Sequence, residues 1–562
     1  MGAAAEHVDA VVIGSGFGGS VTAYRLAQEG IGVVLLERGK AYPPGSFART
    51  PRDLRANFWD PSEGLHGMFD IWSFKGIDAV VCSGLGGGSL IYANVFIRKD
   101  EHWFDSVMPD GTHAPWPVTR ADLDPHYDRV HAIIRPTPYP FDRAPYSTTP
   151  KTNAYREAAA GAGLDWFLPD LAITFGADPA NPVVGAPIPE AIPNLHGMPR
   201  STCRLCGECD VGCNFGAKNT LDYNYLSLAA HHGADLRTRH EVRTFAPRPG
   251  GGWIVRYVVH TGEDSSRLPV QELHCERLIL SAGALGTPFL LLRNADALGG
   301  LPPALGTRFS GNGDLLSFVT NARHRDGRPW PLESPIGPAI SSTIRVPDEN
   351  DLDGGGSGPG YYIQEGGFPV WASWLQEGLD LPGELRRVAH FVLRRVWATI
   401  RHEPQSEIGS QIADVLDDAD KAATLLPMLG MGRDTPDGRF SLDDELLALD
   451  WNEATSQNYL RRVRAAMEAI NDQLGGDLVQ NPLSNLKRLI TVHPLGGAPM
   501  GATPDEGVVD AHGRVFGHPG LHVADGSVMP GPVGPNPSFT IAALADRFAD
   551  AIVAEHRGQP VA

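Results

Sequence analysis

Residues 8–37 read VDAVVIGSGFGGSVTAYRLAQEGIGVVLLE, and this stretch decides the fold of the part of the chain that surrounds it. The apolar run 8–13 predicts a strand, and three glycines follow it at positions 14, 16 and 19. A helical pattern then extends to Gly30, and a second apolar run, 33–36, leads to Glu37. A strand, a G-x-G-x-x-G loop, a helix, a second strand and a terminal acid in this order predict a Rossmann-type βαβ unit.

Each part of this unit has a physical role in binding a dinucleotide. Gly14 permits the tight turn after the strand, Gly16 lets the backbone approach a pyrophosphate, and Gly19 lets the helix pack closely on the sheet. The helix N-terminus offers free N–H groups and the positive end of its dipole to phosphates. Glu37 stands where a carboxylate accepts hydrogen bonds from ribose hydroxyls. The position of this site at the start of a long chain favours FAD over NAD.

A second glycine-rich stretch, VVCSGLGGGSLIYAN, spans residues 80–94. Gly84 and Gly86–Gly88 precede Ser89, and a run of glycines allows a backbone to lie flat against a planar ligand or a phosphate. We therefore predict that this run contacts a flavin, and the alternative is an ordinary glycine-rich loop.

The overall composition limits the class of protein. The 562 residues are enough for two substantial domains. A net charge of −19 argues against nucleic acid as the main partner, because phosphate binding needs a basic surface. We find no apolar run of about 18 residues that would span a membrane, and no basic segment followed by an apolar one at the start. We expect a cytoplasmic protein, with peripheral membrane contact left open.

Weaker patterns along the rest of the chain suggest that nucleotide-domain segments alternate with those of a second domain. Prolines and aromatic residues are frequent in 100–200, which predicts a loop-rich part of the second domain. The other expected elements are a helix in 217–230, strands in 236–285, a helix in 288–293, strands in 315–375, mostly helices in 376–480, a strand at 521–523 and a helix in 538–555.

Four of the six cysteines lie within eleven residues: Cys203, Cys206, Cys209 and Cys213. Their C-x-x-C-x-x-C-x-x-x-C spacing is that of a bacterial ferredoxin run, except that Asn214 follows where proline is usual. Four thiolates also suit zinc. A third interpretation is a set of free thiols or local disulfides, although disulfides are uncommon in the cytoplasm. The sequence leaves these three interpretations open.

The ordered motifs resemble those of the glucose–methanol–choline (GMC) oxidoreductase family, and within it the cholesterol oxidase-like branch. The resemblance spans nearly the whole chain and rests on GSGFGG (14–19), GLGGGSLIYAN (84–94), GAKNTLDYNYL (216–226), SAGALGTPFLL (281–291), HPLGGAPMG (493–501) and the segment 513–547.

This resemblance implies an α/β fold with a Rossmann-like FAD-binding domain and an inserted α+β substrate domain built on a mostly antiparallel sheet. The FAD-binding domain is expected in segments 1–44, 76–98, 235–312 and 500–562. The substrate domain is expected in segments 45–75, 99–234 and 313–499. The implied reaction is oxidation of a secondary alcohol, above all a 3β-hydroxysteroid such as cholesterol. The alternative is a dehydrogenase of another bulky alcohol or sugar that passes electrons through the cysteine cluster to a redox partner.

The resemblance also implies the residues that bind FAD. They are Gly14, Gly16, Phe17, Gly18, Gly19, Glu37, Gly86, Gly87, Ser89, Asn94, Val242, Ala282, Gly283, Asp525, Gly526, Asn536 and Pro537. The electron acceptor, O₂ or a separate redox partner, stays open.

The implied catalytic residues are His493 and Asn536. A histidine can accept the hydroxyl proton because its pKa lies near the working pH, and an asparagine offers both a donor and an acceptor. The structural alternatives are a solvated histidine and a turn-forming asparagine, which would leave a flavoprotein without catalysis. In relatives that oxidise steroids a glutamate moves a proton during double-bond isomerisation, and Glu365 is the best local match. For that role we expect an apolar pocket that raises its pKa.

Overall fold

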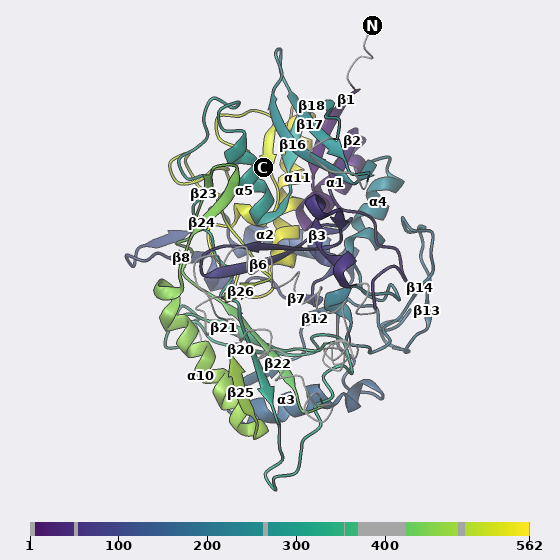
Figure 1. Cartoon of the computed structure of the whole chain (residues 1–562), viewed down its shortest axis with the longest axis vertical. Helices are drawn as coiled ribbons and strands as arrows, with labels where there is room; N and C mark the ends of the chain where they lie inside the picture. Colours follow the sequence, from purple (N-terminus) through teal and green to yellow (C-terminus); the bar gives the residue numbers. More distant parts are fainter. Residues whose placement is uncertain are drawn as a thin grey trace.

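The computed structural model describes residues 6–49, 54–261, 268–352, 355–368, 423–480 and 489–560. The molecule is elongated, with a seven-stranded sheet at the end that holds both termini and a six-stranded sheet at the other end (Figure 1). Between them lies a small sheet of three strands, β5 (Phe69–Ser73), β6 (Ile77–Cys82) and β26 (Leu489–Thr491).

The seven-stranded sheet contains the predicted βαβ unit. Its order is β15-β2-β1-β18-β17-β16, and β27 pairs with β18. The strands β15, β2, β1, β18 and β27 run parallel, and β17 and β16 form an antiparallel extension. Their bounds are β1 Glu6–Ile13, β2 Val33–Glu37, β15 Asp235–Thr238, β16 His240–Pro247, β17 Trp253–Val259, β18 Gln271–Leu280 and β27 Leu521–Val523.

Helices cover this sheet because its central strands are apolar on both faces. Val11, Val12 and Leu35 are fully buried. Helix α1 (Phe17–Gln28) packs against α11 (Ser538–His556) and α4 (Tyr225–His231), and α11 also packs against α2 (Arg120–Ile134). The predicted strands and the helices at 17–28 and 538–556 are confirmed here. The helix expected in 217–230 is shorter, because residues 217–220 are drawn into the polar contacts described below.

The six-stranded sheet is antiparallel throughout, in the order β11-β20-β21-β22-β19-β25. Helices α3 (Pro150–Gly161) and α10 (Gln457–Leu474) pack against it. The strand bounds are β11 Asp165–Phe167, β19 Leu315–Thr320, β20 Thr343–Val346, β21 Tyr361–Glu365, β22 Leu426–Gly432 and β25 Asp477–Gln480. The predicted mostly antiparallel substrate sheet is confirmed.

The prediction of mostly helical structure in 376–480 is wrong for part of the segment. Helix α10 is present, but β22, β23 (Arg439–Asp443) and β24 (Leu446–Asp450) occupy most of 426–450. In β22, Gly430 lets α10 approach the strand, because an added Cβ would lie 2.5 Å from the Val463 side chain. Residues 376–422 lie outside the described residues.

Residues expected in the substrate domain contribute to the core and to a sheet of the expected FAD-binding domain. Segments around α2 and α4 contribute Leu123, Tyr127 and Leu226 to the core of the nucleotide-binding part, although both fall within 99–234. Strand β26, expected in the substrate domain, pairs in parallel with β6 of the FAD-binding domain. The division into domains stays a prediction, and the β26–β6 pairing matters for the site because His493 lies two residues beyond β26.

Candidate flavin and alcohol site

Three loops that we expect to bind the dinucleotide are in direct backbone contact. They contain residues 14–19, 281–283 and 524–526. A Cβ added to Gly18 would lie 1.5 Å from the Ala524 carbonyl oxygen, and one added to Gly14 would lie 2.3 Å from the Ser281 oxygen. Gly14 also has a positive φ of 97°, which favours glycine. Gly16 differs, because no atom lies within 4 Å of its added Cβ. Backbone atoms of the other two loops therefore cover Gly14 and Gly18, whereas the space beside Gly16 is free. The approach of a pyrophosphate requires such free space.

Glu37 lies at the end of β2, beside the same loop. Its Oε2 accepts hydrogen bonds from the Ser15 backbone N–H at 3.0 Å and the Ser15 hydroxyl at 2.6 Å, and its Oε1 accepts from Gly39 N at 2.8 Å. Ser15 Oγ in turn accepts a hydrogen bond from Gly86 N at 3.0 Å. One serine thus connects the predicted ribose-binding acid to the second glycine run.

The second glycine run lies directly on the first. Gly87 has a φ of 52°, and a Cβ added there would lie 2.6 Å from the Cα of Gly16. The Ser89 hydroxyl donates to Gly86 O at 2.7 Å and accepts from Leu221 N at 3.1 Å, so it closes the turn. Beside Gly88 the space is open. The two glycine motifs, far apart in sequence, form one surface.

An unpaired amide marks this surface as a ligand site. Asn94 is fully buried, and neither its Oδ1 nor its Nδ2 has a hydrogen-bond partner. A buried amide without partners costs about 1–3 kcal/mol, so a polar ligand group beside it would be favourable. The open space at Gly16, Gly88 and Gly283 lies on the same loops. These residues fit FAD. The Asn94 amide could donate a hydrogen bond to a polar group of the cofactor and accept one from it.

The remaining residues predicted to bind FAD surround these loops. Asp525 is buried, which raises its pKa, and its Oδ2 accepts from Gly283 N at 2.9 Å and Thr287 Oγ1 at 2.5 Å. It thus ties the 281–287 turn, which includes Ala282, to the 525–527 turn. Val242 is buried on β16, and Phe17 packs against Tyr92. The predicted roles of these residues in binding stay predictions.

His493 follows β26 and is held through one ring nitrogen. Its Nδ1 lies 2.8 Å from Asp314 Oδ1, and its side chain is 14% exposed. Among the described residues no hydrogen bond engages Nε2. An imidazole fixed at Nδ1 with Nε2 free is suited to take a proton from a ligand.

Asn536 lies immediately before Pro537 and the first turn of α11. Its Oδ1 accepts from Gln364 Nε2 at 2.7 Å, and its Nδ2 donates to Gln364 Oε1 at 3.2 Å. This reciprocal pair with β21 fixes the plane of the amide. The N-terminus of α11 adds a favourable field for negative charge at the same place.

The segments of His493 and Asn536 meet at one turn. Gly496 N donates to Gly526 O at 3.0 Å, and Ala498 N donates to Ser527 O at 2.9 Å. A Cβ added to Gly526 would lie 3.3 Å from both Leu495 and Ile541, the latter in the first turn of α11. The segment that follows His493 and the first turn of the helix that follows Asn536 therefore both contact the turn at 525–527, which also contacts the 281–287 turn.

The expected apolar setting of Glu365 is wrong. The carboxylate is fully buried in an ion pair with Lys151, whose Nζ lies 2.8 Å from Oε2. Its Oε1 accepts from Ser341 N and Ser342 N, both at 3.1 Å. Because side chains alternate along a strand, Glu365 points away from the face on which its neighbour Gln364 contacts Asn536. The matched glutamate is adjacent to Gln364, which contacts Asn536, and its role in isomerisation stays a prediction.

This ion pair predicts a large loss of stability on single substitution. Glu365→Gln leaves Lys151 as an uncompensated buried charge, so we expect the free energy of unfolding to fall by about 3–5 kcal/mol. The double variant Lys151→Met/Glu365→Leu removes both charges and should recover most of that loss. Denaturant unfolding of the three proteins measures both effects. Equal stability of the single variant and the wild type would contradict the ion pair.

Three residues that the sequence analysis missed hold the predicted catalytic pair, His493 and Asn536. They are Asp314 on His493, Gln364 on Asn536, and Asn312 on the loop before Asn536. Two of them lie in SGNGD, residues 310–314, where glycines alternate with polar residues just before an apolar strand. That pattern predicts a buried polar turn, but it does not predict which residues the turn contacts.

Lys218 connects the cysteine run to the segment that follows the second glycine run. Lys218 Nζ donates to the carbonyls of Leu90 at 3.0 Å, Tyr92 at 2.8 Å and Cys209 at 2.6 Å. All four cysteines of the run are free thiols in the structure. Backbone N–H groups of Leu205 and Ala339 each lie 3.4 Å from a sulfur, of Cys203 and Cys209 respectively.

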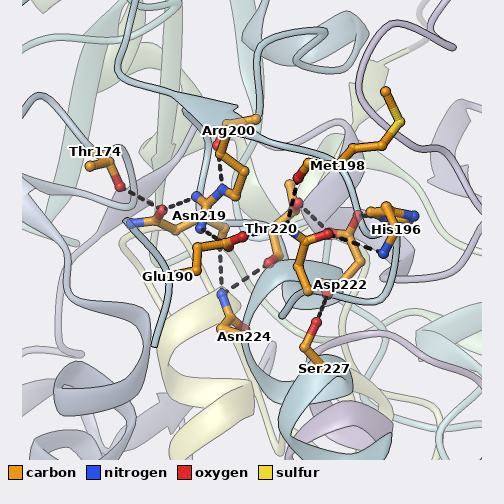
Figure 2. A network of polar contacts seen from close by, with 12 residues as sticks. Thr174, Glu190, His196, Met198, Arg200, Asn219, Thr220, Asp222, Asn224 and Ser227 are labelled. Atoms are coloured by element: carbon orange, nitrogen blue, oxygen red, sulfur yellow. Dashed lines mark hydrogen bonds and ion pairs between the residues drawn. The ribbon is translucent and has the colours of Figure 1, made fainter. Parts of the chain in front are cut away.

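A buried polar network fixes the segment that links this run to the flavin loop (Figure 2). Arg200 Nη2 donates to Asn219 Oδ1 at 2.7 Å, and His196 Nε2 lies 2.7 Å from Asp222 Oδ2. Asn224 Nδ2 donates to the Thr220 carbonyl at 2.9 Å. Residues 219–222 are therefore held from both sides, and only a short 3-10 helix, Leu221–Tyr223, forms before α4.

Comparison with known proteins agrees with this geometry. Models described as GMC oxidoreductase match residues 196–306 and 435–545, and a model of an NAD(P)-binding Rossmann-like domain matches residues 12–58. The cholesterol oxidase of Mycobacterium tuberculosis (strain ATCC 25618 / H37Rv) is 31% identical over 96% of this chain and 90% of its own. The chain belongs to the GMC oxidoreductase family. It is therefore an FAD-dependent alcohol oxidoreductase.

Two further relatives of this GMC oxidoreductase support the fold and the branch. The cholesterol oxidase of Acinetobacter baumannii is 28% identical over 98% of this chain and 95% of its own. The crystal structure of pyridoxine 4-oxidase from Mesorbium loti covers 96% of this chain and 98% of its own, with a TM-score of 0.54 and 17% identity. The described helices include none that is long and apolar enough to cross a membrane.

Three partly exposed apolar side chains, Ile97, Phe167 and Leu429, form what we call the apolar wall. It lies on the face of the six-stranded sheet from which Gln364 contacts Asn536. Leu429 is paired in register with Gln364, so the two side chains share that face. Leu429, Ile97 and Phe167 are partly exposed and pack against a buried cluster of Trp103, Tyr362 and Met431. The GMC oxidoreductase thus presents hydrocarbon surface beside the Gln364–Asn536 pair.

Proposed function

We propose that this GMC oxidoreductase oxidises a 3β-hydroxysteroid to the 3-ketosteroid. The observation that carries the proposal is the partly exposed apolar wall beside the Gln364–Asn536 pair. A rigid hydrocarbon with one hydroxyl would bury its apolar surface there, at about 25 cal/mol per Å². The two cholesterol oxidases among its relatives support the same substrate class.

The chemistry assigned to the protein is that of holding the alcohol and taking its proton. Bound FAD would accept a hydride from the carbinol carbon. His493 takes the hydroxyl proton at Nε2, because Nδ1 is engaged by Asp314. Asn536 hydrogen-bonds the substrate oxygen through an amide whose plane Gln364 fixes. Because Glu365 is saturated by Lys151 and backbone donors, we assign it no step in this reaction.

A sugar is the second substrate class to consider, and the wall argues against it. A site built for a sugar places hydrogen-bonding groups around several hydroxyls, and a buried hydroxyl without a partner is unfavourable. Ile97, Phe167 and Leu429 provide no such groups. We therefore favour a single polar contact at the His493–Asn536 end and hydrocarbon contacts along the rest of the substrate.

Steady-state turnover of matched steroids tests this proposal. We expect oxidation of a 3β-hydroxysteroid with a kcat/KM at least ~100-fold above that of its 3α epimer, since both bury the same rings but only one aligns the hydroxyl. A monosaccharide alcohol serves as the test of the alternative class. Preference for the monosaccharide, or equal rates for the two epimers, would overturn the steroid assignment.

We further propose that Cys203, Cys206, Cys209 and Cys213 hold an iron–sulfur cluster that receives electrons from the flavin site. Lys218 supports this role, because it joins the Cys209 carbonyl to the carbonyls that follow the glycine run. The N–H groups directed at Cys203 and Cys209 would stabilise thiolate ligands.

Zinc is the alternative ligand for this run, because four thiolates also suit it. Metal analysis separates the two.

Metal analysis and acceptor assays test the cluster together. We expect iron and acid-labile sulfide in equal amounts in anaerobically purified protein, and faster turnover with an artificial one-electron acceptor than with O₂. Cys209→Ser should lower the iron content and slow reoxidation, while anaerobic flavin reduction by the steroid is unchanged. Cys275→Ser, a buried thiol on β18, is the matched control. Protein without iron, or with stoichiometric zinc, would contradict the cluster.

A further inference from the structure

One buried turn, residues 310–314 with the sequence SGNGD, contacts the segments of both proposed catalytic residues. It precedes β19 in the six-stranded sheet. Ser310 and Asn312 are fully buried, and Asp314 is 4% exposed. None of the family motifs quoted above includes this turn.

The Asp314 carboxylate anchors His493 and the backbone before it. Its Oδ1 lies 2.8 Å from His493 Nδ1. Its Oδ2 accepts from Val492 N at 2.8 Å and from Thr491 Oγ1 at 3.0 Å, and Thr491 Oγ1 accepts from His493 N at 3.0 Å. The ring and its backbone are therefore held by the same carboxylate, directly and through Thr491.

The Asn312 amide anchors the loop that carries Asn536. Its Oδ1 accepts from Val533 N and Gly534 N, both at 2.9 Å. Its Nδ2 donates to Gly534 O and Pro535 O, both at 3.2 Å. The Asn312 side chain thus forms four hydrogen bonds, all of them with the three residues before Asn536.

A second acid, Asp434, holds the turn itself. Ser310 Oγ donates to Asp434 Oδ1 at 2.5 Å, and Asn312 N donates to Ser310 Oγ at 2.9 Å. Burial raises the pKa of Asp434 to about 7, and the neighbouring Asp314 carboxylate acts in the same direction. Asp314 and Asp434 line one small cavity together with Thr491.

We propose that the 310–314 turn is the positioning element of the reaction centre, with Asp314 the positioning residue for His493 and Asn312 the positioning residue for Asn536. The proposal rests on the proposed function, since it needs His493 as the proton acceptor. It assigns roles to two residues that the sequence motifs did not reveal.

The chemistry of Asp314 follows from its geometry. A carboxylate at Nδ1 favours the tautomer that carries its proton there, so the Nε2 lone pair is free for the substrate. When the hydroxyl proton moves to Nε2, the ring becomes an imidazolium that the carboxylate stabilises. The proton leaves Nε2 to solvent after the ketone departs, so the residues return to their starting state.

The rate of the reaction should report this contact, because the carboxylate orients the ring and stabilises the imidazolium that forms when the proton is taken. The charged groups behind the ring are Asp314, in direct contact, and Asp434 beyond it. Tyr459 packs against the turn through its hydroxyl, which donates to Gly313 O at 2.8 Å.

Anaerobic flavin reduction over a range of steroid concentrations tests the Asp314 role, because it separates the limiting rate from steroid binding. For Asp314→Asn we expect a limiting rate at least ~100-fold lower with steroid binding changed by no more than a few-fold. Asp314→Glu keeps the carboxylate and should recover part of the rate. Thr491→Val keeps the charge but removes the hydroxyl that links Asp314 to the His493 backbone, and it should cost a few-fold in rate.

The outcomes separate this proposal from the proposed function. If His493→Ala abolishes reduction while Asp314→Asn keeps the wild-type limiting rate, the positioning role is wrong and the catalytic assignment stands. If the flavin of His493→Ala is reduced at the wild-type rate, the proposed function itself fails. Should Asp314→Asn not fold, a wild-type limiting rate in both Asp314→Glu and Thr491→Val would overturn the role.

A separate variant tests Asn312. Asn312→Asp replaces two donated hydrogen bonds with a carboxylate facing the carbonyls of Gly534 and Pro535. We expect at least ~10-fold slower flavin reduction at an unchanged FAD content, because the loop before Asn536 loses these contacts while His493 keeps its carboxylate. Reduction at the wild-type rate would overturn this part of the proposal.

Discussion

The variant His493→Ala is expected to reduce its flavin about 10²–10⁴ times more slowly than the wild type when mixed with a 3β-hydroxysteroid. The reason is the loss of the only group that we assign to accept the hydroxyl proton. FAD content should not change, because the contacts of His493 are with Asp314 and Thr491 rather than with the glycine loops. Anaerobic stopped-flow absorbance measures the rate.

A matched histidine variant controls for the loss of an imidazole. His113 is 61% exposed at its side chain and lies on the β8–β9 hairpin, residues 105–115, so His113→Ala should reduce the flavin at the wild-type rate. Dithionite should reduce the flavin equally in all three proteins. A His493→Ala protein that is reduced by the steroid within a few-fold of the wild-type rate would remove His493 from the mechanism.

Gly16→Ala is expected to give a folded protein that retains almost no FAD. The backbone at Gly16 has a φ of −68°, which alanine adopts, and its added Cβ meets no atom within 4 Å. The methyl group would instead occupy the space that we assign to the pyrophosphate. We expect FAD affinity to fall at least ~100-fold, measured by flavin absorbance after dialysis.

Gly18→Ala, two residues away, separates loss of ligand from loss of fold. Its added Cβ would lie 1.5 Å from the Ala524 carbonyl oxygen, so the loops of β1 and β27 must move apart. We expect this variant to unfold or aggregate rather than to form a stable apoprotein. If Gly16→Ala instead binds FAD as the wild type does, the dinucleotide does not approach the chain at Gly16.

The nucleotide-binding half was predictable from sequence because its requirements are local. Gly14 and Glu37 each meet a geometric demand set within one βαβ unit of thirty residues, so spacing alone predicts them. The resemblance then supplied His493 and Asn536. In the structure, the segments that follow these two residues both contact the turn at 525–527.

The residues that hold the catalytic pair could not be predicted, because their partners are distant in sequence. Asp314 and His493 are 179 positions apart, and Gln364 and Asn536 are 172 apart. Such contacts depend on how two sheets meet. Glu365 illustrates the same limit at short range, since a local match cannot say which of two adjacent side chains on a strand faces the site.

The strands in 426–450 show why composition misled the prediction there. The stretch LLPMLGMG contains leucine and methionine, which favour helices, but β22 lies between β19 and β21 in a sheet. Pairing on both sides outweighs intrinsic propensity. The glycines at 430 and 432 carry the relevant signal, because they admit close approach of α10 and of Tyr361.

Anaerobic titration of the purified holoprotein with a 3β-hydroxysteroid tests the central claim most directly. We predict that the steroid bleaches the flavin absorbance and is converted to the 3-ketosteroid. A protein that holds FAD and is bleached by dithionite but not by the steroid would contradict the assigned substrate, and with it the role of the apolar wall beside Asn536.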